Sequence, residues 1–120
     1  METKLYNLEI LKITTEDDIE FLTKILSTFL NSNRNMVNKL KTFYQEKDLL
    51  QIGEVAHKML GSYKHLEINS VIPQLTELEG LTAGKNIDLV RIRSLIEHIT
   101  KDSELVFSDL DVEISEIKNL

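Results

Sequence analysis

The sequence predicts an all-α protein, an up-and-down antiparallel four-helix bundle with a short extra N-terminal helix. Three observations point to this fold class. Apolar residues recur every three or four positions along most of the chain, which is the period of amphipathic helices. Only 4 Gly and 1 Pro interrupt the 120 residues, fewer turn formers than a fold of short strands needs. Short predicted loops make consecutive helices antiparallel neighbours. We expect residues 1–120 to form a single domain.

The N-terminal half is predicted to contain a short helix followed by a long helical segment. Residues 5–13 place three leucines on one helical face. Residues 14–18 are typical of a helix start, because a threonine can cap it and acidic side chains favour the positive helix N-terminus. Residues 19–44 then keep helical spacing. The polar run at residues 31–35 leaves two interpretations open, two helices or one long helix with a kink.

The helix predicted over residues 48–66 has the clearest apolar stripe. Asp48 is its expected N-cap, because an aspartate can accept hydrogen bonds from the first free backbone amides. The apolar positions step by three and four throughout, and we expect their side chains to face the core. They are Leu49, Ile52, Ala56, Met59, Tyr63 and Leu66.

Two further helices are predicted in the remainder of the chain. One begins at residues 69–70, and Pro73 is tolerated in its first turn. Residues 83–86 form the clearest loop, and a last helix is expected over residues 87–117. Whether residues 109–120 stay helical is left open, because three apolar residues there also alternate as in a strand.

Composition and charge exclude several classes of function. The chain has no cysteine, which excludes a disulfide framework, a thiolate zinc site and a cysteine nucleophile. The net charge of −6 argues against a nucleic-acid partner, because the phosphate backbone would be repelled. The first seven residues do not resemble a signal peptide, and no stretch is apolar enough to span a bilayer. We therefore expect a cytoplasmic protein with no membrane partner.

One face of the helix over residues 48–66 carries the candidate functional residues. At 100° per residue, His57 points about 130° away from the centre of the apolar stripe and should be exposed. Gly53 lies one turn before His57, Gly61 one turn after it and Lys64 two turns after it, all on this side. Each interior glycine costs about 1 kcal/mol relative to alanine. Two explanations remain open: the glycines give a partner access to the imidazole, or they allow a neighbouring helix to pack closely.

The segment around His57 resembles the signature of histidine phosphotransfer domains. In that family, Ala-His is followed by a variable residue, an apolar residue, Lys, Gly and Ser. Leu78 and Glu79 also resemble a Leu-Glu pair of the family's next helix, and residues 6–8 and 18–22 look similar to its N-terminal part. The resemblance covers most of the chain, although its specific motif is short. The residues that match the signature are Ala56, His57, Met59, Gly61 and Ser62.

The resemblance implies a carrier of phosphoryl groups rather than a stand-alone enzyme. His57 would accept a phosphoryl group and donate it between the aspartates of response-regulator receiver domains. The partners would be these receivers and a hybrid sensor histidine kinase. The receiver would supply the aspartate, Mg²⁺ and a lysine, so this chain, expected to be a monomer, needs no cofactor or metal of its own. Access and docking around the acceptor would involve Gly53, Lys58, Leu60, Gly61 and Lys64.

Two positions depart from the family pattern. Leu60 stands where the family usually has a lysine, and Glu67 stands where it often has a glycine. Lys58 or Lys64 could supply the missing positive charge, or both could simply be solvated. The departures keep a second function open, a helical docking module that binds a receiver or another signalling protein without being phosphorylated.

The other histidines give no comparable signal. His65 lies about 12 Å along the helix axis from His57, too far to share a metal ion with it. His98 lies off the apolar stripe of the last helix. The chain lacks the paired Glu-x-x-His motifs of di-iron bundles and has no glycine-rich phosphate-binding motif.

Overall fold

Five helices account for most of the computed structural model, which describes residues 5–119. No strand occurs in these residues, so the all-α prediction is confirmed. The helices are, in chain order, α1 (Glu9–Thr14), α2 (Ile19–Gln45), α3 (Leu49–His65), α4 (Ile72–Ala83) and α5 (Leu89–Lys118).

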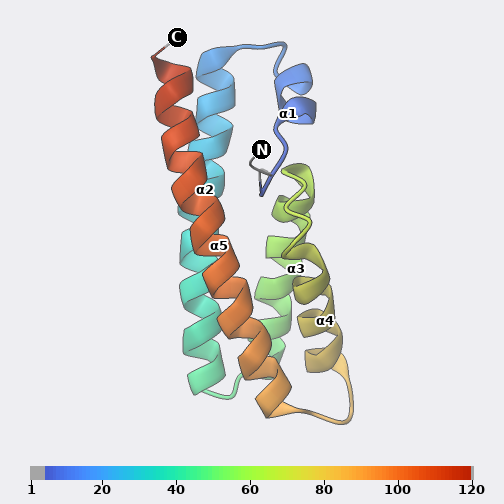
Figure 1. The fold of residues 1–120 in the computed structure, drawn as a ribbon. Coiled ribbons are helices and arrows are strands. Elements are labelled where there is room, and N and C mark those ends of the chain that lie inside the picture. Colours follow the sequence, from blue (N-terminus) through green and yellow to red (C-terminus); the bar gives the residue numbers. More distant parts are fainter. Residues whose placement is uncertain (1–4, 120) are drawn as a thin grey trace.

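The four longer helices lie alongside one another (Figure 1). α2 packs against α3 and α5, and α4 packs against the same two helices. The chain direction alternates, because α2 runs away from the end that carries α1, α3 returns, and α4 and α5 repeat this course. The molecule measures 50 × 29 × 20 Å along its principal axes. None of the helices within residues 5–119 combines the length and the apolar character needed to cross a bilayer.

Aspartate side chains cap three of the helices at their N-termini. Asp18, Asp48 and Asp88 accept hydrogen bonds from backbone amides three residues later, at 3.1, 3.2 and 3.0 Å. Each bond satisfies an amide that has no partner within its own helix. The predicted cap at Asp48 is confirmed. The expectation of a threonine cap for the long helix is wrong, because Thr14 and Thr15 end α1 and the cap is Asp18.

The structure settles both uncertain segments in favour of continuous helix. α2 runs unbroken through the polar residues 31–35. There Asn33 is buried, and its side-chain amide donates to the carbonyl of Phe29 at 3.0 Å, one turn earlier in the same helix. At the other end of the chain, α5 stays helical to Lys118. Leu110 and Ile114 are buried there while Val112 is exposed, as helical spacing requires.

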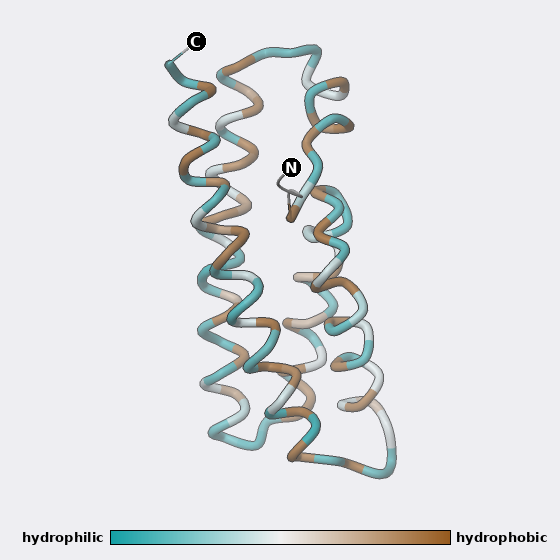
Figure 2. The backbone as a smooth tube through the Cα atoms, viewed as in Figure 1, coloured by the Kyte–Doolittle hydropathy of each residue, from teal (hydrophilic) through white to brown (hydrophobic). Residues whose placement is uncertain are grey.

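The core lies between the helices, and Figure 2 shows brown apolar segments recurring along each of them. Within the core, the hydroxyls of Tyr63 on α3 and Ser103 on α5 form a hydrogen bond of 2.7 Å. Burial raises the pKa of Tyr63, so its hydroxyl stays protonated. Ile52, Ala56 and Met59 on α3 are also completely buried, which confirms the predicted core-facing stripe of this helix.

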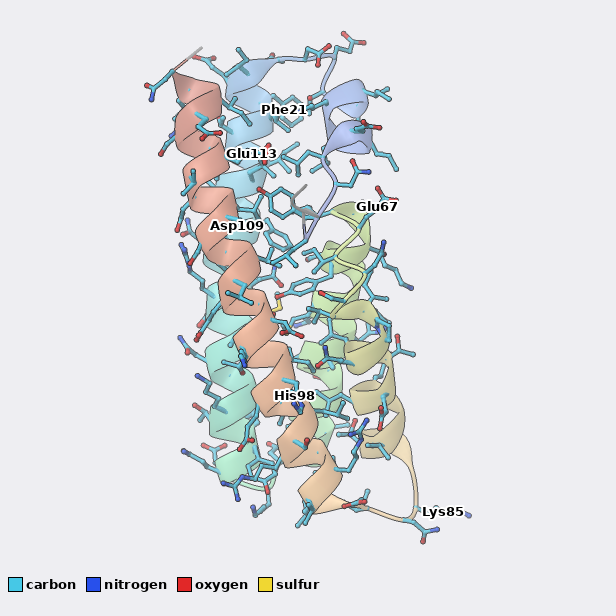
Figure 3. The ribbon with its side chains drawn as sticks, in the orientation of Figure 1. Phe21, Glu67, Lys85, His98, Asp109 and Glu113 are labelled. Atoms are coloured by element: carbon cyan, nitrogen blue, oxygen red, sulfur yellow. The ribbon has the colours of Figure 1, made fainter. Side chains whose placement is uncertain are left out.

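Hydrogen bonds attach the chain before α1 to α5 and to the segment just after α3. The hydroxyl of Tyr6 donates to the carboxylate of Glu113 on α5 at 2.7 Å (Figure 3 labels Glu113). The amide of Asn7 donates to the carbonyl of Leu66, just after α3, at 2.8 Å. Together with the buried Leu8 and Leu11, these contacts hold the N-terminal segment against α5 and the end of α3.

Candidate functional site

His57 lies on α3 with 74% of its side chain exposed. Met59 and Ala56, its near neighbours in sequence, are completely buried. The phase of the apolar stripe therefore predicted the orientation of His57 correctly. The imidazole stands at the surface of a helix whose opposite side is anchored in the core.

Glu79 on α4 contacts the imidazole directly. The Nδ1 atom of His57 lies 2.7 Å from Oε2 of Glu79, whose side chain is 37% exposed. In a neutral imidazole one ring nitrogen carries the proton, and a carboxylate partner fixes which one. In the neutral ring, the contact with Glu79 favours the tautomer that carries its proton on Nδ1 and leaves the lone pair on Nε2. The family resemblance included Glu79, but nothing in the spacing of the sequence placed it against His57.

A shallow groove of about 450 Å³ opens beside the imidazole, between α3 and α4. Leu50, one of its lining residues, is 71% exposed. An apolar side chain of a docked protein could enter this groove next to the histidine. The groove is lined by Leu49, Leu50, Gly53, Glu54, His57, Lys58, Glu79, Thr82 and Ala83.

The two glycines on this side of α3 have different surroundings. A Cβ atom at residue 61 would meet no other atom within 4 Å, so Gly61 leaves open space one turn after His57. A Cβ atom at residue 53 would lie only 2.7 Å from Oγ1 of Thr82 on α4. Gly61 therefore fits the explanation that a glycine gives a partner access to the imidazole. Gly53 fits the other explanation, that a glycine allows a neighbouring helix to pack closely.

Leu60, which we expected to take part in access and docking around the acceptor, is instead a buried residue of α3. Only 8% of Leu60 is exposed, and it forms part of the core cluster. Leu60 lies within about 20° of Gly53 around the helix, and α4 packs against α3 on that side. The buried arc of α3 is therefore wider than its apolar stripe indicated. Lys58 and Lys64, by contrast, are exposed, so positive charge near His57 can come from them.

We predict that Leu60→Lys lowers the stability of the protein. The substitution removes a buried leucine side chain, whose burial is worth about 1.5–3 kcal/mol, and places an ammonium group at the edge of the core. Urea denaturation should show a loss on the order of 1–3 kcal/mol. Lys64→Leu is the control, because Lys64 is exposed and should change stability by less than about 0.5 kcal/mol. A Leu60→Lys protein as stable as the wild type would contradict the buried position.

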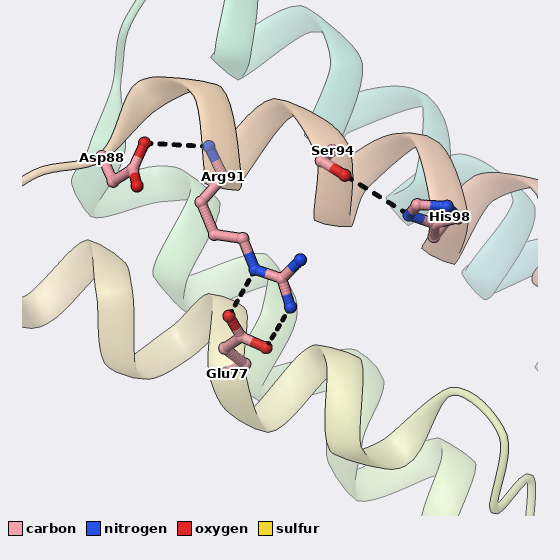
Figure 4. A network of polar contacts seen from close by, with 5 residues as sticks. All are labelled: Glu77, Asp88, Arg91, Ser94 and His98. Atoms are coloured by element: carbon pink, nitrogen blue, oxygen red, sulfur yellow. Dashed lines mark hydrogen bonds and ion pairs between the residues drawn. The ribbon is translucent and has the colours of Figure 1, made fainter.

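The remaining histidines lie away from His57. His65 is the last residue of α3, and His98 lies on α5, where its Nδ1 is 3.5 Å from Oγ of Ser94 (Figure 4). Among residues 5–119, no cluster of three or more His, Asp or Glu side chains could hold a metal ion.

A bidentate ion pair between Glu77 and Arg91 joins α4 to α5 (Figure 4). Nε and one terminal nitrogen of Arg91 donate to the two carboxylate oxygens of Glu77 at 2.6 and 2.7 Å. These hydrogen bonds lower the pKa of Glu77 and raise that of Arg91. Glu77 and Glu79 thus connect α4 to its two neighbouring helices, Glu77 to α5 and Glu79 to α3.

Comparisons of the chain with models of known protein families, with curated proteins and with solved structures found no match.

Proposed function

We propose that this protein is a histidine phosphotransfer protein of a phosphorelay, built as an up-and-down four-helix bundle with a short N-terminal helix. His57 accepts a phosphoryl group from the aspartate of one response-regulator receiver domain and donates it to another. The observation that carries the proposal is the exposed imidazole of His57, held at Nδ1 by Glu79 within a segment that resembles the family signature.

The chemistry follows from the free Nε2 atom. Its lone pair attacks the phosphorus of an aspartyl phosphate, an N–P bond forms, and the P–O bond to the aspartate breaks. The electron pair of that bond leaves with the aspartate carboxylate. Because Nδ1 keeps its proton, the phosphorylated ring carries a positive charge, which the carboxylate of Glu79 stabilises at 2.7 Å. Attack by a second aspartate at phosphorus reverses these changes.

The surroundings of His57 suit a protein partner that must bring its own active site to the imidazole. Gly61 leaves open space one turn after His57, and the groove lined by Leu50 offers an apolar contact beside the imidazole. Lys58 and Lys64 are exposed on α3 and can attract the acidic pocket of a receiver. In this proposal the receiver provides Mg²⁺, a hybrid sensor kinase starts the relay, and the chain acts as a cytoplasmic monomer without catalysis of its own.

The test is transfer from receivers of the same organism that have been phosphorylated beforehand. The purified chain should take up phosphate in an acid-labile, alkali-stable form, as expected for a phosphohistidine. Gly61→Leu should slow this transfer, because a leucine side chain would occupy the open space beside the imidazole. Gly80→Leu, at another helical glycine with open space around it, is the matched control. Receivers that bind the chain without transferring phosphate would instead indicate the docking module, which the replacement of the usual lysine by Leu60 favours.

A further inference from the structure

The contact between Gly53 and Thr82 lies next to the contact between His57 and Glu79. Gly53 precedes His57 by four residues on α3, and Thr82 follows Glu79 by three residues on α4. The two contacts join the same pair of helices and are separated by about one helical turn, or about 6 Å. The distance between α3 and α4 at Gly53 and Thr82 therefore affects the distance between His57 and Glu79.

Thr82 has little freedom to move away from residue 53. Its Oγ1 is hydrogen-bonded to two carbonyl oxygens of its own helix, at 3.1 Å for Leu78 and 3.0 Å for Glu79. Its side chain is also β-branched and therefore stiff at χ1. A methyl group on residue 53 would lie 2.7 Å from Oγ1 of Thr82 and would have to push this atom away. The same methyl group would lie 3.6 Å from Cβ of Thr82, which is an ordinary contact.

We propose that Gly53 is a positioning residue for the phosphoryl acceptor. Because it has no side chain, α4 approaches α3 closely enough for the carboxylate of Glu79 to hold Nδ1 of His57. Gly53 thus fixes, through Glu79, which imidazole nitrogen is free to react. Its relevance to transfer rests on the proposed function, but the state of the imidazole can be measured without any phosphate.

The test uses nitrogen-15 NMR of the His57 imidazole in four variants. In the wild type, the neutral ring should carry its proton on Nδ1. In Gly53→Ala, the spectrum should lose this preference and move towards that of a solvated histidine. Gly53→Ala combined with Thr82→Ala should restore the wild-type spectrum, because the second change removes the clashing Oγ1 atom. Thr82→Ala alone and Gly80→Ala, whose new methyl group meets nothing within 4 Å, should leave the spectrum unchanged.

Each outcome decides the proposal. An unchanged His57 spectrum in folded Gly53→Ala, or a double variant that stays altered, would overturn it. If Gly53→Ala does not fold, the double variant alone decides, because a folded protein with the wild-type spectrum supports the steric relation and an altered spectrum overturns it. Failure of the proposed function is a separate result, since it appears as absence of phosphate transfer to a wild-type chain whose imidazole is ordered as described.

Discussion

Replacing His57 with glutamine should abolish phosphate uptake while leaving the stability of the protein unchanged. The glutamine amide nitrogen has no basic lone pair, so it offers no nucleophile to an aspartyl phosphate. Because 74% of the His57 side chain is exposed, the free energy of unfolding should change by less than about 0.5 kcal/mol. Labelling from a phosphorylated receiver measures the first effect, and urea denaturation measures the second.

The other two histidines provide matched controls for this experiment. His65→Gln and His98→Gln remove an imidazole from the end of α3 and from α5, and both variants should be labelled like the wild type. Label that persists in His57→Gln would place the acceptor elsewhere. A large loss of stability in that variant would make His57 a structural residue and remove the basis of the carrier function.

Truncating Met59 to alanine should have the largest effect on stability. Met59 is 0% exposed and lies on α3 two residues after the acceptor. Removal of a buried side chain of this size leaves a cavity and costs about 2–5 kcal/mol. The urea midpoint should fall accordingly, with little change in the slope of the transition.

Lys58→Ala is the control for the truncation of Met59. Lys58 is the residue before Met59 and is exposed, so its loss should cost less than about 0.5 kcal/mol. Equal effects of the two substitutions would mean that α3 is not rotated as described, and the exposure of His57 would then be in doubt.

The predictions that succeeded depend on local information. The cap at Asp48 involves an amide only three residues away, and the exposure of His57 follows from helical period within one helix. Local information could not predict that α2 is continuous or that α5 stays helical to its end. Asn33 and Val112 carry weak or opposing local preferences, and burial against neighbouring helices decides between the alternatives.

The features of the candidate site also fall into two groups, those that follow from one helix alone and those that depend on how the helices pack. The sequence by itself determined an all-α fold, the core-facing side of α3 and the histidine on its outer side, because each follows from periodicity along one helix. Only the tertiary structure decided that Leu60 is buried, that Gly53 packs against Thr82 while Gly61 is open, and that Glu79 holds His57. These three features depend on where α4 lies against α3. That placement arises from the packing of side chains far apart in the sequence, which no pattern within a single helix encodes.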